Sequence, residues 1–226
     1  MTTPEAYVSL LKDAFQANAN PGQAAQMEAY MKHNARFYGI KTPERKAIVK
    51  NHIASVGMPE GAELKAVCRL CFKPDARREL QYAVNDLLQK SLRRLTPDFL
   101  DLVEELIPRN CWWDTVDFLS PKIAGGLLLR FPEYQKDYPD RWIESDDFWF
   151  QRAAIIFQLG YKEKTDTDRL FRYILRRADS TEFFVQKGAG WALRQYARTA
   201  PESVRGFVRQ NPQLPTLTIR EATKHL

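Results

Sequence analysis

Part of the sequence repeats itself at an interval of 35 residues. The segment ESDDFWFQRAAIIFQL (144–159) aligns with DSTEFFVQKGAGWALR (179–194). The matched pairs are Ser145 and Ser180, Phe148 and Phe183, Gln151 and Gln186, and Arg152 and Lys187. A repeat of this length with helical periodicity indicates a solenoid of stacked helix pairs, in which each pair buries its apolar face against its neighbours.

The repeat extends toward the N-terminus for two more intervals. The aligned pairs are Trp113 and Phe148, Asp117 and Arg152, Gln81 and Val116, and Tyr82 and Asp117. Residues 1 to about 70 do not fall into this register. We expect that region to form a divergent cap or additional helices, within a single domain over residues 1–226.

The pattern of apolar residues predicts an all-α fold. Neither a run of β-branched alternation nor an Asn-Gly hairpin turn is found, whereas apolar spacing of three and four residues recurs along the chain. Prolines such as Pro43, Pro97, Pro121 and Pro201 fall between these stretches and are expected to separate helices. Near the end, Thr218 to Glu221 (TIRE) fits a capping box at the start of a last helix.

The charge balance favours a polyanionic partner. The chain has 34 Lys and Arg against 28 Asp and Glu, a net charge of +6, which suits nucleic acid or an anionic membrane. A membrane span is not expected, because no stretch approaches about 20 apolar residues. The N-terminal segment resembles no secretory signal, so we expect a soluble intracellular protein located in the cytoplasm.

The cysteines do not predict a disulfide framework or a metal centre. Cys68 and Cys71 form a CxxC pair, but zinc would need two further ligands, for which the chain offers Cys111 and three scattered histidines. We expect the two thiols to pack as small apolar groups on one helix face, and neither a metal nor an organic cofactor is implied.

Equivalent positions of successive repeats line one face of a solenoid, and this face is usually the concave binding surface. Asp117, Arg152 and Lys187 occupy one such position. Trp113 lies one helical turn before Asp117, and Trp191 lies one turn after Lys187, so all five should line one groove.

The neighbouring tryptophan is interpreted differently. Trp112, Val116 and Leu119 are spaced as the core stripe of the same helix. A tryptophan on a helix is more often part of a core than a binding platform, and this alternative applies to Trp113 as well. Asp117 and Arg152 could likewise form an ion pair between repeats and nothing more.

A carboxylate between aromatic rings in a basic groove is poorly suited to binding phosphates, because its charge opposes them. It suits a reaction in which positive charge appears. Cleavage of a glycosidic bond develops an oxocarbenium-like sugar that a carboxylate stabilises. An alkylated base already carries a positive charge, and an indole face attracts such a cation by about 0.5–2 kcal/mol.

Long motifs in the same order resemble one known family, the AlkD-like bacterial DNA glycosylases. The matching segments are YMKHNARFYGIKTPER (30–45), WWDTVD (112–117), WFQRAAIIFQLGYK (149–162), FFVQKGAGWALRQYA (183–197) and IREATKHL (219–226). The resemblance covers nearly the whole chain. It implies a solenoid of HEAT-like helical repeats with a concave basic groove, which binds double-stranded DNA containing alkylated purines as a monomer. Such a protein is expected in the cytoplasm, in association with the nucleoid.

The resemblance also implies a role for each residue that matches. Asp117 corresponds to the catalytic carboxylate, and Arg152 to an arginine that holds the DNA backbone near the lesion. The rings that contact the sugar and backbone of the lesion correspond to Trp113 and Trp191, and Tyr30 matches a tyrosine near the same groove. Lys187, at the repeat position of Arg152, is expected to contact DNA as well. The family is thought not to draw the base into a protein pocket.

Three further sequence features each allow two interpretations. Gly188 and Gly190 lie inside a helical pattern and serve either tight helix packing or close approach of DNA. Asp114 could be a second catalytic carboxylate or a capping or ion-pairing group. A stripe of arginines either binds phosphates or forms a solvated outer face; it consists of Arg169, Arg172 and Arg176.

The sequence therefore predicts a DNA glycosylase for cationic alkylated purines, and the resemblance implies that these are N3- or N7-alkylated. The main alternative is a non-catalytic helical-repeat adaptor that binds nucleic acid or protein. A third option is a glycosidase for another nucleoside-like substrate, which the net charge of +6 disfavours. An adaptor needs no carboxylate in its groove, whereas the enzyme does.

Overall fold

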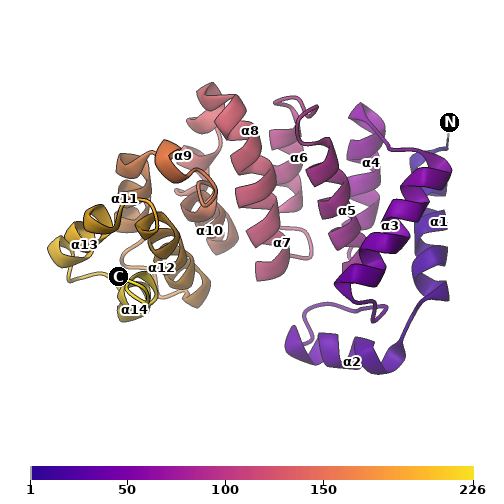
Figure 1. Ribbon diagram of the computed structural model, residues 1–226, viewed down its shortest axis with the longest axis horizontal. Helices are drawn as coiled ribbons and strands as arrows, with labels where there is room; N and C mark the ends of the chain where they lie inside the picture. Colours follow the sequence, from indigo (N-terminus) through magenta and orange to yellow (C-terminus); the bar gives the residue numbers. More distant parts are fainter. Residues whose placement is uncertain (1) are drawn as a thin grey trace. The chain divides into compact units, whose positions relative to one another are not determined.

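The computed structural model describes residues 2–226, and every regular element in that range is a helix (Figure 1). The all-α class expected from the sequence is therefore confirmed. The chain divides into two compact units, one ending at Thr115 and the other beginning at Val116. The single domain expected over residues 1–226 stays a prediction.

The first unit is built from helices, several of which pack on more than one neighbour. Its helices are α1 (Pro4–Ala17), α2 (Pro21–Tyr30), α3 (Thr42–Val56), α4 (Gly61–Cys71), α5 (Arg78–Ser91) and α6 (Phe99–Leu106). Helix α1 packs on α3 and α4, and α5 packs on the same two helices. Figure 1 shows α2 running at a steep angle to α1 and α3. The N-terminal region thus forms additional helices, one of which departs from the common direction.

The segment after α2 is held by a buried carboxylate. Glu79 on α5 is fully buried and accepts hydrogen bonds from the backbone N–H groups of Tyr38 (2.9 Å), Gly39 (2.9 Å) and Ile40 (3.1 Å). Gly39 has a φ of +87°, and a Cβ there would lie 2.0 Å from the Asn20 carbonyl oxygen. Only glycine fits this turn, which fixes the segment between α2 and α3 against α5.

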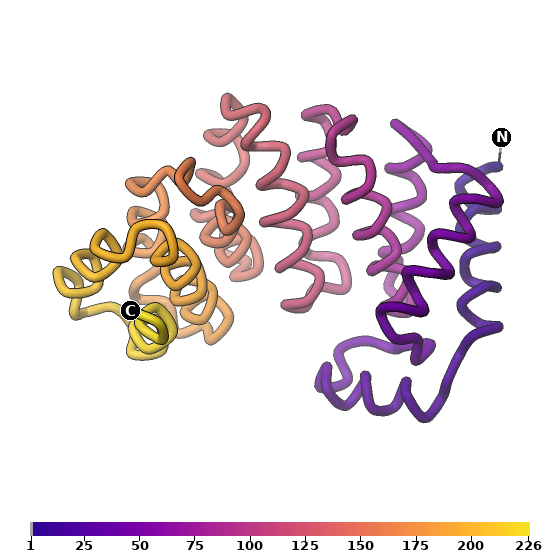
Figure 2. Tube along the Cα trace, in the orientation of Figure 1, coloured from indigo at the N-terminus to yellow at the C-terminus, as the bar shows by residue number. Residues whose placement is uncertain are grey.

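The second unit begins within α7 (Trp113–Phe118). Its further elements are η1 (Leu119–Ala124), α8 (Gly125–Arg130), η2 (Pro132–Gln135), α9 (Pro139–Trp142), α10 (Phe148–Ile156), η3 (Lys162–Lys164), α11 (Thr167–Arg176), α12 (Phe183–Ala197), α13 (Pro201–Gln210) and α14 (Thr216–Ala222). Helix α12 packs against α10, α13 and α14, and Figure 2 shows the course of the chain through these helices. Helix α12 is thus the centre of this unit.

The 35-residue repeat corresponds to repeated hydrogen bonds in this unit. The side-chain amide of Gln151 donates to the Ser145 carbonyl oxygen (2.8 Å), and that of Gln186 donates to the Ser180 carbonyl oxygen (2.8 Å). Each serine hydroxyl also accepts from the backbone N–H two residues later. The same device therefore fixes the turn before α10 and the turn before α12.

Pro121 does not separate two helices, contrary to the expectation from the sequence. It lies within the π-helical turn Leu119–Ala124, which continues α7 into α8. The backbone N–H of Gly125 donates to the Ser120 carbonyl oxygen, five residues earlier. Proline in an α-helix clashes with the carbonyl four residues before it. The wider π turn accommodates that ring, so the helix continues through Pro121.

The predicted capping box at Thr218 is also wrong. Helix α14 begins at Thr216 after Pro215, so Thr218 lies inside it. The Thr218 hydroxyl donates to the Gln186 carbonyl oxygen on α12 (3.0 Å), and Glu221 is buried against α12. Thr218 and Glu221 therefore make contacts between α14 and α12, and neither caps the start of a helix.

Candidate functional site

In the second unit, Asp117 and Arg152 form a bidentate ion pair. Arg152 Nε lies 2.7 Å from Asp117 Oδ1, and Nη2 lies 2.7 Å from Oδ2. Arg152 Nη1 donates to the Phe184 carbonyl oxygen on α12. The Arg152 side chain is 5% exposed and that of Asp117 is 17% exposed. The carboxylate is thus held in a fixed orientation while one part of it faces solvent.

Helix α12 is shaped to accept this arginine. A Cβ at Gly188 would lie 3.0 Å from Arg152 Nη1, tighter than ordinary packing allows. The indole of Trp191 lies on the same helix, with its ring centre 6.0 Å from the guanidinium carbon. Gly190 makes room for α14, since a Cβ there would lie 2.4 Å from Glu221 Cβ. Both glycines therefore serve close packing within the protein.

These partners bear on the DNA-backbone contact expected of Arg152. The hydrogen-bonding nitrogens of its guanidinium already face Asp117 and the Phe184 carbonyl. A side chain that is 5% exposed has little surface left for a phosphate. The DNA contact of Arg152 stays a prediction, and the geometry favours a role in orienting Asp117.

The first unit brings Tyr30 and Trp113 together. Their ring centres lie 6.2 Å apart at an angle of 79°, an edge-to-face contact. Tyr30 is 74% exposed at the end of α2. Trp113 packs against the cluster formed by Ala24, Met31 and Phe37. This cluster sets the position of Trp113 at the start of α7, the helix that carries Asp117 one turn later.

Trp112 is only partly the core residue expected from the sequence. Val116 and Leu119 are fully buried, but Trp112 precedes α7 and packs, half-buried, against the same cluster as Trp113. Its backbone N–H donates to the Thr115 hydroxyl (3.4 Å). The helical spacing could not reveal that the helix begins one residue later.

Asp114 is a structural group of the first unit. Its carboxylate accepts a hydrogen bond from the Tyr82 hydroxyl (2.6 Å) and lies 3.5 Å from Arg78 Nε, with 7% of its side chain exposed. Burial, and then the nearby Asp114 charge, raise the pKa of Tyr82 well above its usual value. A carboxylate enclosed in this way is not placed to reach a substrate, which favours the ion-pairing interpretation.

A second charged cluster lies where the repeat places Lys187. Lys187 Nζ lies 3.5 Å from Glu221 Oε1, and Lys224 Nζ lies 2.7 Å from the same oxygen. Arg194 Nη1 lies 2.5 Å from Glu221 Oε2. The hydrogen bonds from Lys224 and Arg194 lower the pKa of Glu221 to about 2. Glu221 lies 34 residues after Lys187, one residue short of the repeat, and this near-match is the one sequence signal of its ion pair with Lys187.

The depressed pKa of Glu221 predicts a stability that depends on pH. An unfolded glutamate titrates near pH 4.3, so its ion pairs contribute fully above that pH and are lost as pH falls toward about 2. We expect Glu221→Gln to lower the free energy of unfolding by roughly 2 kcal/mol at pH 7. The difference from wild type should disappear near pH 2. Urea unfolding across this range measures it, and a constant difference would contradict the assignment.

The arginine stripe on α11 faces acidic partners. Arg172 Nη2 lies 3.1 Å from Asp140 Oδ1, and Arg176 Nη2 lies 2.6 Å from Glu144 Oε2. Arg169 also contacts Asp140. The side chains of Arg172 and Arg176 are 61% and 54% exposed. These pairs favour the solvated outer face over the phosphate-binding stripe.

Cys68 and Cys71 are fully buried on α4. Burial raises the pKa of the Cys71 thiol to about 12, so this thiol is neutral at neutral pH and packs as an apolar group. Over residues 2–226, no three candidate metal ligands gather at one place. In the same range, no helix combines the length and apolar character that crossing a bilayer requires.

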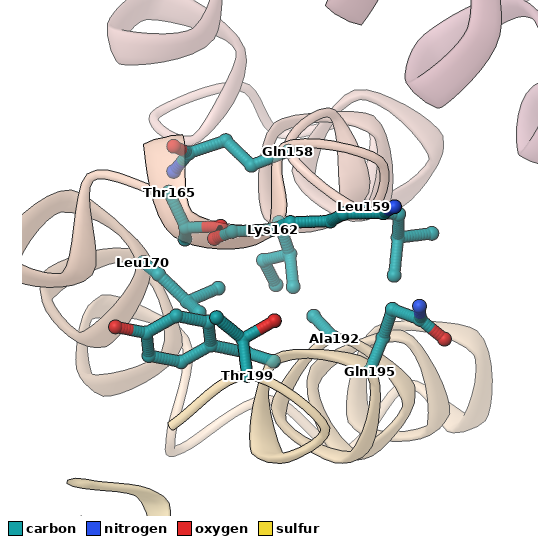
Figure 3. Close-up of a pocket in the computed structure, with 10 residues that line it drawn as sticks. Gln158, Leu159, Lys162, Thr165, Leu170, Ala192, Gln195 and Thr199 are labelled. Carbon is teal, nitrogen blue, oxygen red and sulfur yellow. Dashed lines mark hydrogen bonds between the residues drawn. The ribbon is translucent and has the colours of Figure 1, made fainter.

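Two pockets differ greatly in what they could hold. The one in Figure 3, lined by Gln158, Leu159, Lys162 and neighbouring residues, has a volume of about 20 Å³ and could accept one water molecule. The first unit carries an open pocket of about 500 Å³, lined in part by Arg36 and Gln81. Of these two, the second could hold a purine base, as could a pocket of about 230 Å³ lined in part by Tyr7 and Met58.

Comparison with known proteins gives a consistent result. A family model described as DNA alkylation repair enzyme matches residues 11–226. A solved structure from Enterococcus faecalis, described as a predicted DNA alkylation repair enzyme, is 32% identical in sequence with a TM-score of 0.85. The match covers 92% of this chain and 96% of that chain. A search of curated proteins finds no match.

Proposed function

Because this chain belongs to the family of DNA alkylation repair enzymes, we propose that it is a DNA glycosylase. Its substrates would be N3- and N7-alkylated purines in duplex DNA, which carry a positive charge. The observation that carries the proposal is the Asp117 carboxylate, fixed by two hydrogen bonds from Arg152 and still partly exposed.

In the proposed reaction, the bond between C1′ and the base nitrogen breaks, and its electron pair leaves with the base. The cationic base becomes neutral as it departs, so no carboxylic acid has to protonate it. Positive charge develops on the sugar, and the Asp117 carboxylate stabilises it. A water molecule then adds to C1′ and gives up a proton, which leaves an abasic site.

The aromatic side chains support the same substrate. Trp191 lies beside Arg152, and Trp113 contacts the exposed Tyr30. Indole faces attract cations, so we propose that both tryptophans contact the lesion nucleotide, with Tyr30 near it. Lys187 is half-exposed and would contact the DNA backbone.

One observation favours the alternative, a non-catalytic DNA-binding protein. The Asp117 charge is already matched by Arg152, as an ion pair between repeats would require. The two functions differ in chemistry, so one assay separates them. The purified protein is incubated with duplex DNA containing N7-methylguanine, and free base is measured. Binding without release of base would establish the alternative.

Arg152 offers a test of how the site is organised. We expect Arg152→Ala to reduce base release strongly, because Asp117 loses both of its hydrogen bonds. The free energy of unfolding should also fall, on the order of 3 kcal/mol, since a largely buried carboxylate is left unpaired. The salt dependence of binding to undamaged duplex should not change. A slope reduced by about one ion would instead show that Arg152 contacts a phosphate.

A further inference from the structure

Three cations of the second unit converge on one carboxylate. Lys187 and Arg194 come from α12, and Lys224 follows α14. All three have a nitrogen within 3.5 Å of a Glu221 oxygen. One negative charge thus faces three positive charges, and the cluster keeps a net charge of +2.

The three cations are not equivalent. Arg194 has 22% of its side chain exposed and also donates to the Glu221 backbone carbonyl (3.0 Å), so it fastens α14 to α12. The side chains of Lys187 and Lys224 are 44% and 47% exposed. The two lysines help to hold the Glu221 carboxylate, yet about half of each lysine side chain stays in contact with solvent. These exposed parts remain accessible to a ligand while the ion pairs persist.

Glu221 Oε1 holds both lysine ammonium groups close together. Two ammonium groups repel each other at such a separation, and the shared carboxylate oxygen offsets that repulsion. Each ammonium has three N–H donors, and the partly exposed side chains leave donors for a ligand. The arrangement suits an anion with several acceptor oxygens that can contact both lysines at once.

We propose that Lys187 and Lys224, positioned by Glu221, bind a single phosphodiester of the DNA backbone. The proposal rests on the proposed function in taking DNA as the partner. Arg152 on α10 bonds both Asp117 and the Phe184 carbonyl on α12, the helix that carries Lys187. Arg152 thus joins the helix that carries Asp117 to the helix that carries Lys187, and we infer that the phosphate belongs to the strand that presents the lesion to Asp117.

The test measures binding of undamaged duplex DNA at several salt concentrations. We expect the double variant Lys187→Ala/Lys224→Ala to bind more weakly and to lower the slope of log K against log salt by about one ion. A reduction of one rather than two is expected because both lysines share one phosphate. The charge-preserving variant Lys187→Arg/Lys224→Arg should retain the wild-type slope.

The matched control is Arg172→Ala/Arg176→Ala, which removes two exposed, acid-paired cations from α11. This variant should retain the wild-type slope of log K against log salt. An equal reduction of the slope in both double variants would show a general effect of charge and overturn the proposal. An unchanged slope in the lysine variant, or a loss of two ions, would overturn it as well. If the double alanine variant unfolds, Lys187→Gln/Lys224→Gln, which keeps most of each aliphatic stem, replaces it and should also lower the slope by about one ion.

Undamaged duplex makes this result independent of base release. The glycosylase proposal would fail, and the phosphate site would stand, if the wild-type protein released no base but the lysine double variant still lowered the slope of log K against log salt. The phosphate site would fail, and the glycosylase proposal would stand, if the wild-type protein released base but the lysine double variant kept the wild-type slope.

Discussion

Replacing Asp117 with asparagine should reduce release of N7-methylguanine by roughly 10²–10³-fold, while binding to undamaged duplex persists. The amide keeps the shape of the side chain but carries no charge to stabilise the oxocarbenium-like sugar. It also presents an N–H₂ group to Arg152, so one of the two hydrogen bonds seen with the carboxylate is lost. Both effects act on the chemical step.

Single-turnover release of base measures this loss, and fluorescence anisotropy with undamaged duplex measures binding. Asp114→Asn is the matched control, because Asp114 lies on the same helix but is enclosed by Tyr82 and Arg78. The control should lower the free energy of unfolding and leave base release by the folded protein intact. Release at the wild-type rate by Asp117→Asn would remove Asp117 from the mechanism.

Neutral lesions such as uracil or 1,N6-ethenoadenine should be released about 10²-fold more slowly than N7-methylguanine, or slower still. A neutral base leaves as an anion unless an acid protonates it, and it gains nothing from the indole faces of Trp113 and Trp191. Asp114 is not placed to act as that acid, since it is buried within the first unit.

Duplexes that differ only in the lesion allow the comparison under single-turnover conditions. The rates should follow the charge of the base rather than its size. Efficient release of uracil would contradict the mechanism, because it would require protein groups that read a neutral base. The open pocket lined by Arg36 and Gln81 would then be the first place to search for them.

The all-α class and the pairing of Asp117 with Arg152 could be predicted from the sequence. Helical periodicity and the 35-residue interval placed Asp117 opposite Arg152, and the two side chains do meet. The interval succeeds because equivalent helices pack alike, as the matching hydrogen bonds of Gln151 and Gln186 show. The family resemblance that these motifs suggested is confirmed over residues 11–226.

Partners of individual side chains could not be predicted in the same way. The spacing placed Arg152 on a binding face, but its near-complete burial depends on the space left by Gly188 on α12. The TIRE pattern assigned Glu221 to a capping box, whereas its partners Lys187 and Arg194 lie on α12, 34 and 27 residues earlier in the chain. Local patterns carry no information about such contacts.

The π-helical turn at Leu119–Ala124 sets the direction in which Asp117 points relative to the buried face of α8. Each residue of an α-helix turns the chain by about 100°, and a π turn holds one residue more than an α turn. The face of α7 that carries Asp117 is therefore rotated about the helix axis relative to the face of α8, compared with an uninterrupted helix. Helix α8 can bury Leu127 and Leu128 completely while Asp117 keeps its own orientation toward Arg152. The extra residue changes the angular register of the helix, so that α8 packs into the core while the preceding turn directs Asp117 toward Arg152.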